Sequence, residues 1–525
     1  MSSLSDAVGR LAGYVPGWLD QATIAQSTLA GIAAVLGSYA VVGFTPALVT
    51  APIESFLVTW MPGVVITFAI TVLGELGKKL NLVTAISLGI GGFAAVSFVA
   101  IKITRRSGRS SASFTDVETD AATTAAVPLV VGGAILAVAF ALTGETGSSM
   151  GAGIAAATVA GVSEIGVGSG SGVKRSGRRR LLRSGGTLAL GGAGAYFLGS
   201  RGGLAGEAEI ESNPDVTQPS DLMEREAVKE GVASRLDEAE DKSLSVRGIE
   251  PLVSENFYRT DINNTVPTPD AEGWELSITG AVQSEQTYDF ENLGSFDPQH
   301  RFISLRCVGE NLNGNKMDNA IWTGVPIEPL LQQANPQADF VMAHAVDGYS
   351  VGFPLEELEG AFLAYGMNGE RLPREHGYPV RLLVPGNWGE VNVKWIDELE
   401  IQQEEEKGYW EKKGWKGTGE VKTVAKIKSV NRMNDRVQVA GHAYAGTRGV
   451  SAVEISVDGG DSWEEATLSE PLPGQDVWRQ WKHVYYDPGD HEVIARAIEE
   501  DGTVQPSKET GSFPSGPSGW VSRSV

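Results

Sequence analysis

The feature that most limits the fold is a series of apolar stretches in the first two hundred residues. They are rich in Ala, Gly, Val, Leu and Ile and carry few charges. Each approaches the roughly 20 residues needed to cross the hydrocarbon core of a membrane. Buried helices of a soluble protein look similar singly, but several in a row with short polar loops indicate membrane spans. The expected spans are residues 27–49, 56–76, 81–101, 125–143, 149–168 and 185–200.

Two clusters of basic residues set the expected orientation. One contains Lys102, Arg105, Arg106 and Arg109. The other contains Lys174, Arg175, Arg178, Arg179, Arg180 and Arg183. The clusters lie two spans apart, so the positive-inside rule allows both to be cytoplasmic. The last span would then lead outward, and everything after residue 205 would be extracytoplasmic.

The second cluster reads Gly-Arg-Arg-Arg-Leu-Leu-Arg and precedes a mildly apolar, Gly-rich stretch. This pattern resembles a twin-arginine export signal in an internal position. A plain positive-inside flank explains the same residues equally well. Export by that route suits a protein that is already folded around a cofactor.

The net charge of −23 and the pI near 4.8 argue against a nucleic-acid partner. Most acidic residues follow residue 205. A strongly acidic soluble part suits a protein that must stay solvated in high salt, which suggests a halophilic source. An ordinary acidic surface is the alternative interpretation.

A chain of 525 residues is too long for one core, so we expect several domains. Residues 1–204 form the expected membrane domain, and 205–248 an acidic linker with one amphipathic helix at 221–240. Short alternating strands with a few short helices then predict a mixed domain at 249–420. Closely spaced β-type runs predict a small β-sandwich at 421–515, followed by a tail at 516–525. The runs are Lys422–Val430, Arg436–Ala443, Ala452–Val457, His483–Tyr486 and Glu492–Ala497.

The chain has a single cysteine, which excludes an internal disulfide and a Cys-rich zinc or iron–sulfur site. Cys307 ends an apolar, strand-like run and precedes a Gly/Asn-rich loop, a place where a side chain is presented to a ligand. The adjacent Arg306 would favour the thiolate, which is the form that binds a metal. A lone cysteine is more often a small buried hydrophobe.

Several motifs around Cys307 favour a metal-binding thiolate over a small buried hydrophobe. They are Asn319-Ala-Ile-Trp-Thr-Gly-Val-Pro, Ala364-Tyr-Gly-Met-Asn-Gly-Glu-Arg-Leu-Pro, His376-Gly-Tyr-Pro-Val-Arg-Leu-Leu-Val-Pro-Gly and Asn392-Val-Lys-Trp-Ile. Their order and spacing resemble the molybdopterin-binding domain of the sulfite oxidase family. Two later motifs, Val453-Glu-Ile-Ser-Val-Asp-Gly-Gly-Asp-Ser-Trp and Asp501-Gly-Thr-Val-Gln-Pro, resemble that family's immunoglobulin-like dimerisation domain. The resemblance covers 250–515 and implies a helical membrane bundle, an α+β molybdopterin-binding domain and a C-terminal immunoglobulin-like β-sandwich.

The resemblance also implies roles for individual residues. Cys307 would be the thiolate ligand of molybdenum. The pterin and its phosphate would be held by Tyr258, Arg259, Asp347, His376, Arg381, Asn392, Val393 and Lys394. Arginine gives a phosphate a bidentate partner, lysine a point charge and backbone N–H groups a cradle. Taken singly, each of these residues could be an ordinary turn or strand residue.

Two departures from the family concern the substrate. The Asn-Arg-Arg stretch that follows the metal cysteine in the family is replaced here by a run without arginine, and Lys316 is the nearest cation. Trp415 stands where the family has its active-site tyrosine, and Trp322 keeps the pocket aromatic. These changes make the expected catalytic pocket less selective for anions, which leaves sulfite in doubt. Trp415 could also be a packing residue.

The resemblance implies a molybdenum–molybdopterin enzyme that transfers an oxygen atom to or from a small oxyanion or sulfoxide-like substrate. All six histidines (His300, His344, His376, His442, His483 and His491) follow the last expected span, so no haem and no iron–sulfur cluster are expected. A separate cytochrome or copper protein would take the electrons, and the sandwich allows a homodimer. The runner-up resembles bacterial periplasmic methionine-sulfoxide reductases, which share Arg-Cys-Val. A membrane-displayed immunoglobulin-like interaction protein is the alternative without catalysis.

Overall fold

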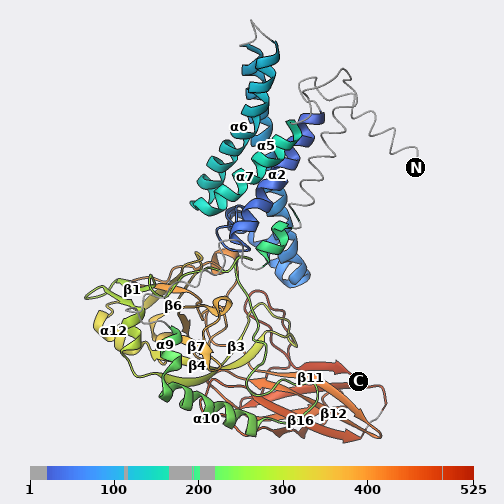
Figure 1. Ribbon diagram of the computed structural model, residues 1–525. Coiled ribbons are helices and arrows are strands. Elements are labelled where there is room, and N and C mark those ends of the chain that lie inside the picture. The colour runs from blue at the N-terminus through green and yellow to red at the C-terminus, as the bar shows by residue number, and fades with distance from the viewer. Residues whose placement is uncertain (1–20, 111–115, 165–191, 193, 201–218, 487–488) are drawn as a thin grey trace. The chain divides into compact units, whose positions relative to one another are not determined.

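The computed structural model describes residues 21–110, 116–164, 192, 194–200, 219–486 and 489–525 (Figure 1). The chain divides into two compact units, which are described separately. The first contains residues 1–60, 77–211 and 263–266. The second contains 61–76, 212–262 and 267–525.

The first unit is helical. Its helices are α2 (Gln21–Val42), α3 (Ala51–Trp60), α5 (Glu75–Ser110), α6 (Asp116–Thr143) and α7 (Thr146–Glu164). Helix α7 packs on α2 through small residues, since a Cβ on Gly37 would lie 2.2 Å from the Gly151 carbonyl oxygen. Glu164 is buried and pairs with Arg105, so part of the first basic cluster is neutralised inside this unit.

Three of its helical segments are long and apolar enough to cross a membrane, namely Gln21–Val42, Leu76–Ser107 and Ala125–Thr143. They match the stretches expected at 27–49, 81–101 and 125–143. The described part of the stretch at 149–168, which ends at Glu164, lies in α7, and α7 is not among these segments. The second basic cluster, and with it the twin-arginine-like sequence and half of the stretch at 185–200, lies outside the described residues.

The prediction of a span at 56–76 is wrong. Helix α3 ends at Trp60, and Pro62 then precedes the short helix α4 (Gly63–Phe68). A π-helical turn, η1 (Ala69–Leu73), follows and ends at Gly74 with φ +53°. Proline lacks the N–H that a continuous helix needs, so the apolar run is divided here. Its second part, 61–76, belongs to the second unit.

The mixed domain of the second unit contains two sheets. One has the strand order β2-β1-β10-β5-β6, and the other β3-β4-β7-β8 with β9 paired to β7. The strands are β1 (Glu275–Gly280), β2 (Gln286–Asp289), β3 (Gln299–Arg306), β4 (Met317–Pro326), β5 (Phe340–Ala345), β6 (Ser350–Pro354), β7 (Phe362–Met367), β8 (Glu370–Arg371), β9 (Arg381–Leu383) and β10 (Ile396–Gln402). Helices α11 (Phe290–Gly294) and α12 (Glu328–Ala334) complete the domain. Only β1 and β10 pair in parallel.

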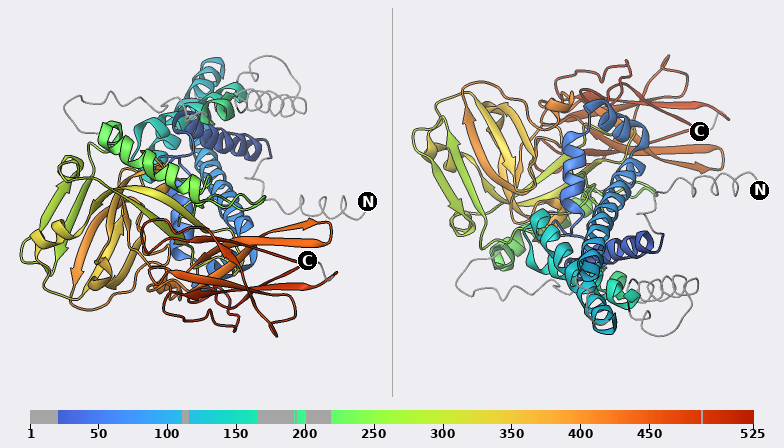
Figure 2. Two further views of the ribbon diagram at one scale, coloured as in Figure 1. Left: turned by 90° about the horizontal axis from the view of Figure 1, so that it is seen from below. Right: turned by 90° about the horizontal axis from the view of Figure 1, so that it is seen from above.

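The C-terminal part of the second unit consists of two antiparallel sheets, coloured orange to red in Figure 2. One contains β11 (Val424–Met433), β12 (Arg436–Tyr444), β16 (Arg479–Tyr486) and β15 (Thr467–Leu468). The other contains β14 (Glu464–Glu465), β13 (Val450–Ser456), β17 (Glu492–Glu499) and β18 (Val521–Ser524). The expected β-type runs correspond to β11, β12, β13, β16 and β17, which confirms the predicted β architecture.

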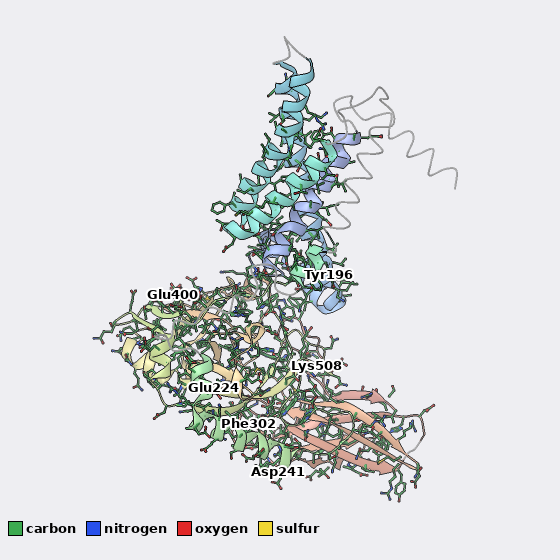
Figure 3. The ribbon with its side chains drawn as sticks, in the orientation of Figure 1. Tyr196, Glu224, Asp241, Phe302, Glu400 and Lys508 are labelled. Atoms are coloured by element: carbon green, nitrogen blue, oxygen red, sulfur yellow. The ribbon has the colours of Figure 1, made fainter. Side chains whose placement is uncertain are left out.

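The second half of the expected acidic linker is packed on the mixed domain. It forms α9 (Pro219–Glu224) and α10 (Glu226–Lys242), whose Glu224 and Asp241 are labelled in Figure 3. Val228 and Val232 of α10 are buried in the core, with exposed fractions of 1% and 2%. Most of the amphipathic helix expected at 221–240 is therefore present as α10, although the chain is extended at Arg225 and α9 is a separate short helix. The apolar face of α10 is covered by the domain.

A buried cluster of charges joins the mixed domain to the sandwich. Glu310 accepts hydrogen bonds from Arg306 Nε at 2.7 Å and from Lys426 Nζ at 2.7 Å. The three side chains are at most 1% exposed. Opposite charges hold the pKa of the Glu310 carboxyl below its usual range, against the effect of burial, which alone would raise it. Removing one member leaves an uncompensated charge in the interior.

We expect Glu310→Gln to lower the free energy of unfolding by about 3–5 kcal/mol, because Arg306 and Lys426 then stay buried without a counter-charge. Denaturant unfolding of the full-length protein in detergent measures this loss. The control is Glu420→Gln, which removes the 69%-exposed partner of Arg448. An exposed pair of this kind contributes less than about 1 kcal/mol. Equal effects of the two substitutions would contradict the role of the buried cluster.

A second prediction concerns His442 on β12. It is buried, stacks on Trp478 with 3.9 Å between ring centroids, and lies 3.0 Å from the Glu250 carbonyl oxygen. Burial lowers its pKa from 6.5 to about 3. The folded chain therefore keeps the imidazole neutral in a pH range where the unfolded chain binds a proton. Stability should fall as the pH drops from 6.5 towards 3, by up to about 1.4 kcal/mol per pH unit.

The measurement is the unfolding midpoint as a function of pH for the wild type and for His442→Gln, whose amide reaches the position of the imidazole Nε2 that contacts the Glu250 carbonyl. The unfolding midpoint of the variant should depend less on pH than that of the wild type, because the variant has no imidazole at position 442. An unchanged slope between pH 6 and pH 4 would show that His442 does not cause it.

Candidate functional site

Cys307 follows β3 directly and is 9% exposed. Its N–H donates to the Lys316 carbonyl at 2.9 Å, which ties together the two ends of the 307–316 loop. Its Sγ lies 3.9 Å from Thr260 Oγ1. Burial raises the pKa of the Cys307 thiol, and Lys316 and the Gly309 N–H act in the opposite direction.

The expectation that Arg306 favours the thiolate is wrong. Successive side chains of a strand point to opposite faces, so Arg306 turns away from Cys307. Its guanidinium donates to Glu310 and, at 2.7 Å, to the Lys422 carbonyl, and it lies 5.0 Å from the Trp388 ring. Lys316 is the cation that lowers the pKa of Cys307.

Gly309 leaves space beside the sulfur. A Cβ at this position would lie 3.9 Å from Cys307 Sγ, 3.7 Å from Trp415 Cη2 and 3.4 Å from Ile70 Cγ2. The sulfur, an indole ring and an aliphatic side chain therefore surround one small space. Ile70 was not among the predicted site residues, because the sequence places it in an expected span far from Cys307.

The cations expected to hold the phosphate lie on neighbouring strands. Arg381 of β9 forms an isolated bridge with Lys394. The Arg381 guanidinium lies 5.4 Å from the Trp322 ring, and its Nη1 donates to the His376 carbonyl at 3.3 Å. Its buried Nε has no hydrogen-bond partner within the described part of the chain. Burial lowers the pKa of Arg381 to about 10, which leaves it charged at neutral pH.

Asp261 is a site residue that the sequence did not reveal. Its carboxylate accepts hydrogen bonds from Arg259 and from Lys394, and its side chain is 6% exposed. Burial lowers the pKa of Lys394 to about 8, and Asp261 acts in the opposite direction. The proximity of Asp261 to Arg259 in sequence was a weak signal, but Lys394 is 133 positions away.

His376 and Asp347 lie beside the charged side chains of Asp261 and Lys394. Burial and the charges of Arg381 and Lys394 lower the pKa of His376 to about 3, so its ring is neutral. Phe257 packs edge-on against this ring at 5.6 Å between centroids. Burial raises the pKa of Asp347 to about 6, while the Tyr349 N–H and Lys394 lower it.

Tyr258 lies near the sulfur side of the site. Its N–H donates to Asp318 at 2.7 Å, and its hydroxyl approaches Gly389 so closely that a Cβ there would lie 2.5 Å away. Burial and the neighbouring Cys307 raise the pKa of Tyr258 well above its usual value, so the phenol is neutral.

Asn392 and Val393 have structural contacts in this arrangement. The Asn392 amide accepts from the Val384 N–H at 2.8 Å and donates to the Trp388 carbonyl at 3.1 Å. The Val393 carbonyl accepts from the Leu382 N–H at 2.8 Å. The Asn392 side chain is thus engaged within the domain and the Val393 side chain is buried, so a contribution to phosphate binding would come from backbone N–H groups.

The two tryptophans expected in the pocket differ. Trp322 is fully buried and donates from Nε1 to the Ile303 carbonyl at 3.0 Å, so it forms a floor beneath Arg381. Trp415 is 3% exposed, and its ring lies by the space at Gly309. Trp410 and Phe513 pack edge-on against it, at 6.2 and 5.3 Å. Its Nε1 has no hydrogen-bond partner in the described residues.

This arrangement fits a cofactor that carries both a metal and an anionic group. The cations Arg259, Arg381 and Lys394 gather at one end, and the unpartnered Nε of Arg381 is a donor for an anion. At the other end, the Cys307 sulfur faces the space that Gly309 leaves.

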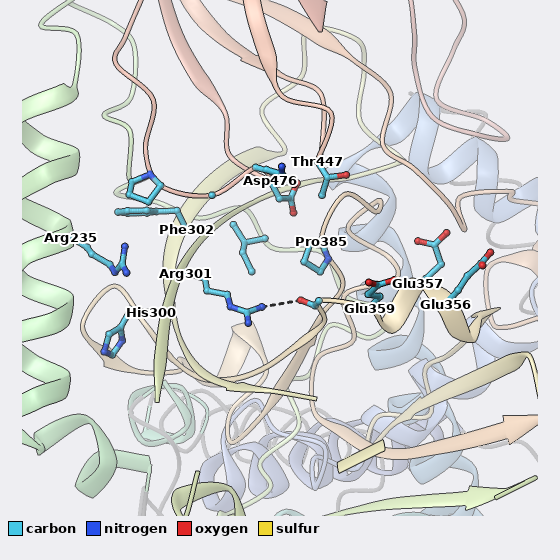
Figure 4. Close-up of a pocket in the computed structure, with 15 residues that line it drawn as sticks. Arg235, His300, Arg301, Phe302, Glu356, Glu357, Glu359, Pro385, Thr447 and Asp476 are labelled. Carbon is cyan, nitrogen blue, oxygen red and sulfur yellow. Dashed lines mark hydrogen bonds between the residues drawn. The ribbon is translucent and has the colours of Figure 1, made fainter. Parts of the chain in front are cut away.

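A separate cavity of about 590 Å³ lies between the mixed domain and the sandwich (Figure 4). It is lined by charged side chains of both signs, among them Arg235, Arg301 and Asp476. Arg301 donates to the Gly360 carbonyl at 3.0 Å, as the dashed line shows. None of the predicted cofactor residues lines it.

Comparison with known families agrees with the site. The family described as an oxidoreductase molybdopterin binding domain matches residues 263–410, and the Mo-co oxidoreductase dimerisation domain matches 419–513. The chain carries both domains of the sulfite oxidase family. It is thus related to molybdopterin-binding oxidoreductases, and the matched ranges fall close to the expected 249–420 and 421–515.

Individual relatives are distant. Mitochondrial sulfite oxidase of Rattus norvegicus is 26% identical over 298 residues, which cover 46% of this chain and 55% of the relative. An uncharacterized oxidoreductase of Bacillus subtilis, YuiH, is 29% identical over 155 residues, 29% of this chain and 76% of that one. The solved sulfane dehydrogenase SoxCD of Paracoccus pantotrophus is 23% identical, covers 47% of this chain and 72% of that one, and gives a TM-score of 0.42. The chain spans little more than half the length of the mammalian sulfite oxidases it matches.

The Arg381→Met variant should bind the anionic cofactor more weakly, because it lacks the guanidinium that is expected to hold the phosphate. Hydrogen bonds to charged groups contribute about 1.5–3 kcal/mol, so affinity for molybdopterin should fall about 10- to 100-fold. The measurement is pterin released from the purified protein, by fluorescence, per mole of chain. Arg301→Met is the control, since it removes a half-buried guanidinium outside the site. Equal pterin content in the two variants would contradict the assignment.

Proposed function

We propose that the chain is a membrane-anchored molybdenum-cofactor oxidoreductase that acts on a small sulfur-type substrate. The observation that carries this proposal is the position of Cys307, at a strand end beside the small space that Gly309 leaves and near a cluster of cations that suits a phosphate. The bound cofactor would supply two-electron oxygen-atom transfer.

The residues of the chain would bind and orient that cofactor. Cys307 would provide the thiolate ligand, and Arg381 with Lys394 would hold the phosphate. Neutral His376 and Tyr258 can each donate one hydrogen bond to the pterin side of the site. Asp261 keeps the cations oriented, because it bonds to both Arg259 and Lys394.

The walls near the sulfur favour a substrate of low charge. Trp415 and Ile70 border the space at Gly309, and Lys316 is the one cation among the groups that shift the pKa of Cys307. Sulfite is a dianion at alkaline pH and would lack the arginine that relatives offer. A sulfoxide reductase is therefore the second candidate, since a sulfoxide is uncharged and needs only a hydrogen-bond donor such as the Trp415 N–H.

The proposal also covers the orientation of the protein in the membrane, its electron carrier and its oligomeric state. The basic clusters support an extracytoplasmic catalytic part, and a reporter fused after residue 205 tests this orientation. A separate cytochrome or copper protein would accept or supply electrons, and the match at 419–513 supports a homodimer. Halophilic origin and use of the twin-arginine-like sequence are further parts of the proposal.

A metal and substrate test decides between the candidates. Purified protein should contain molybdenum and pterin in equal amounts, and turnover with sulfite and with several sulfoxides then identifies the reaction. Absence of both components would favour the interaction-protein alternative. Faster turnover of sulfite than of every sulfoxide would reject the second candidate.

Cys307→Ser should abolish turnover. Loss of a group that only supports a ligand costs 10- to 100-fold in activity, so loss of the ligand itself should cost at least about 100-fold. Turnover is measured per mole of molybdenum on the same preparation, with Thr260→Val as the control beside the sulfur. A Cys307→Ser protein with unchanged turnover would contradict the ligand assignment.

A further inference from the structure

The short apolar segment between α3 and α5 belongs to the same compact unit as Cys307. It contains α4 (Gly63–Phe68) and η1 (Ala69–Leu73), and residues 61–74 carry no charged side chain. Such a segment is too short to cross a membrane, and its length is typical of re-entrant or interfacial elements. The site described above uses only Ile70 of it.

One stripe of this segment faces the Cys307 site. Ile66 and Ile70 are four positions apart; Ile66 is 7% exposed, and Ile70 packs against the core. Ile70 Cγ2 lies 3.4 Å from the Cβ position of Gly309, beside Cys307 Sγ and Trp415. At Gly63 the backbones approach so closely that a Cβ would lie 2.5 Å from the Lys413 carbonyl oxygen. The segment is thus seated on the mixed domain, and Ile70 borders the Cys307 site.

The opposite stripe is apolar and uncovered. Val64, Phe68 and Val72 follow one another at intervals of four positions and are 83%, 52% and 65% exposed. A helix that is apolar on both faces belongs in a membrane or a protein core, because water does not solvate either face well. The inner stripe already occupies the core of the domain.

We infer that Val64, Phe68 and Val72 insert into the lipid surface and that residues 61–74 hold the Cys307 site against the membrane. Chain continuity identifies the occupant, since Leu76–Ser107 follows at once and is long and apolar enough to span a bilayer. The same segment then borders the Cys307 site through Ile70 and anchors the domain in the lipid.

Spin labelling tests this placement, because Cys307 is the single native cysteine and is buried. Val64→Cys, Phe68→Cys and Val72→Cys are made in the full-length, metal-loaded protein and labelled with a nitroxide. The wild type, treated identically, shows the labelling of Cys307. The proteins are reconstituted in nanodiscs of phosphatidylcholine and phosphatidylglycerol. The control is Val484→Cys, at a 40%-exposed position of β16 in the same unit.

Relaxation enhancement by oxygen, which concentrates in lipid, should exceed enhancement by a water-soluble nickel chelate several-fold at the labels on the outer stripe. The control should show the reverse. Equal access of the nickel chelate to the stripe and to the control would overturn the inference. Low access of both reagents would overturn it too, because a second copy or a partner protein would then cover the stripe. The readout does not depend on turnover, so either outcome leaves the proposed reaction untouched.

Discussion

The buried ion cluster of Arg306, Glu310 and Lys426 is the constraint on which the catalytic region depends. Charges in an interior are tolerated only when they are paired, so these three side chains can exist there only together. Arg306 ends β3 one residue before Cys307, and Glu310 lies in the loop that follows it. Glu310 also accepts from the Lys316 N–H at 3.0 Å, which closes the loop around Cys307. The C-terminal sandwich, through Lys426, therefore supports the loop that carries the proposed metal ligand, in addition to any role in dimerisation.

The site has two chemically distinct ends. Arg259, Arg381 and Lys394 form a charged end in which one carboxylate, Asp261, is shared by two of the cations. The other end, around Cys307, is bordered by an indole ring and an isoleucine. A ligand that is anionic at one end and carries a metal at the other satisfies both. This apolar border supports the proposed preference for a substrate of low charge.

The sequence predicted the architecture well because its signals are local. The β-type runs after residue 420 became strands, and the apolar run before Cys307 became β3. The failures needed information that is not local. The apolar run at 56–76 looked like one span, since hydropathy does not register the break at Pro62 or the partner that Ile70 finds at Gly309. Arg306 is next to Cys307 in sequence but faces the opposite side of the strand. Asp261 could be assigned to the site only after folding brought Lys394 to it.

The contacts that close the loop around Cys307 have a consequence for biosynthesis. Glu310 receives Lys426 from 116 positions later in the chain, and Asn313 bonds to the backbone of Ile427. At about 5–20 residues per second, a ribosome delivers that distance in roughly 6–23 s. During this interval Cys307 already exists but its loop lacks its supports. If Cys307 holds the cofactor as proposed, the loop would have its final form for cofactor insertion only after the sandwich has folded.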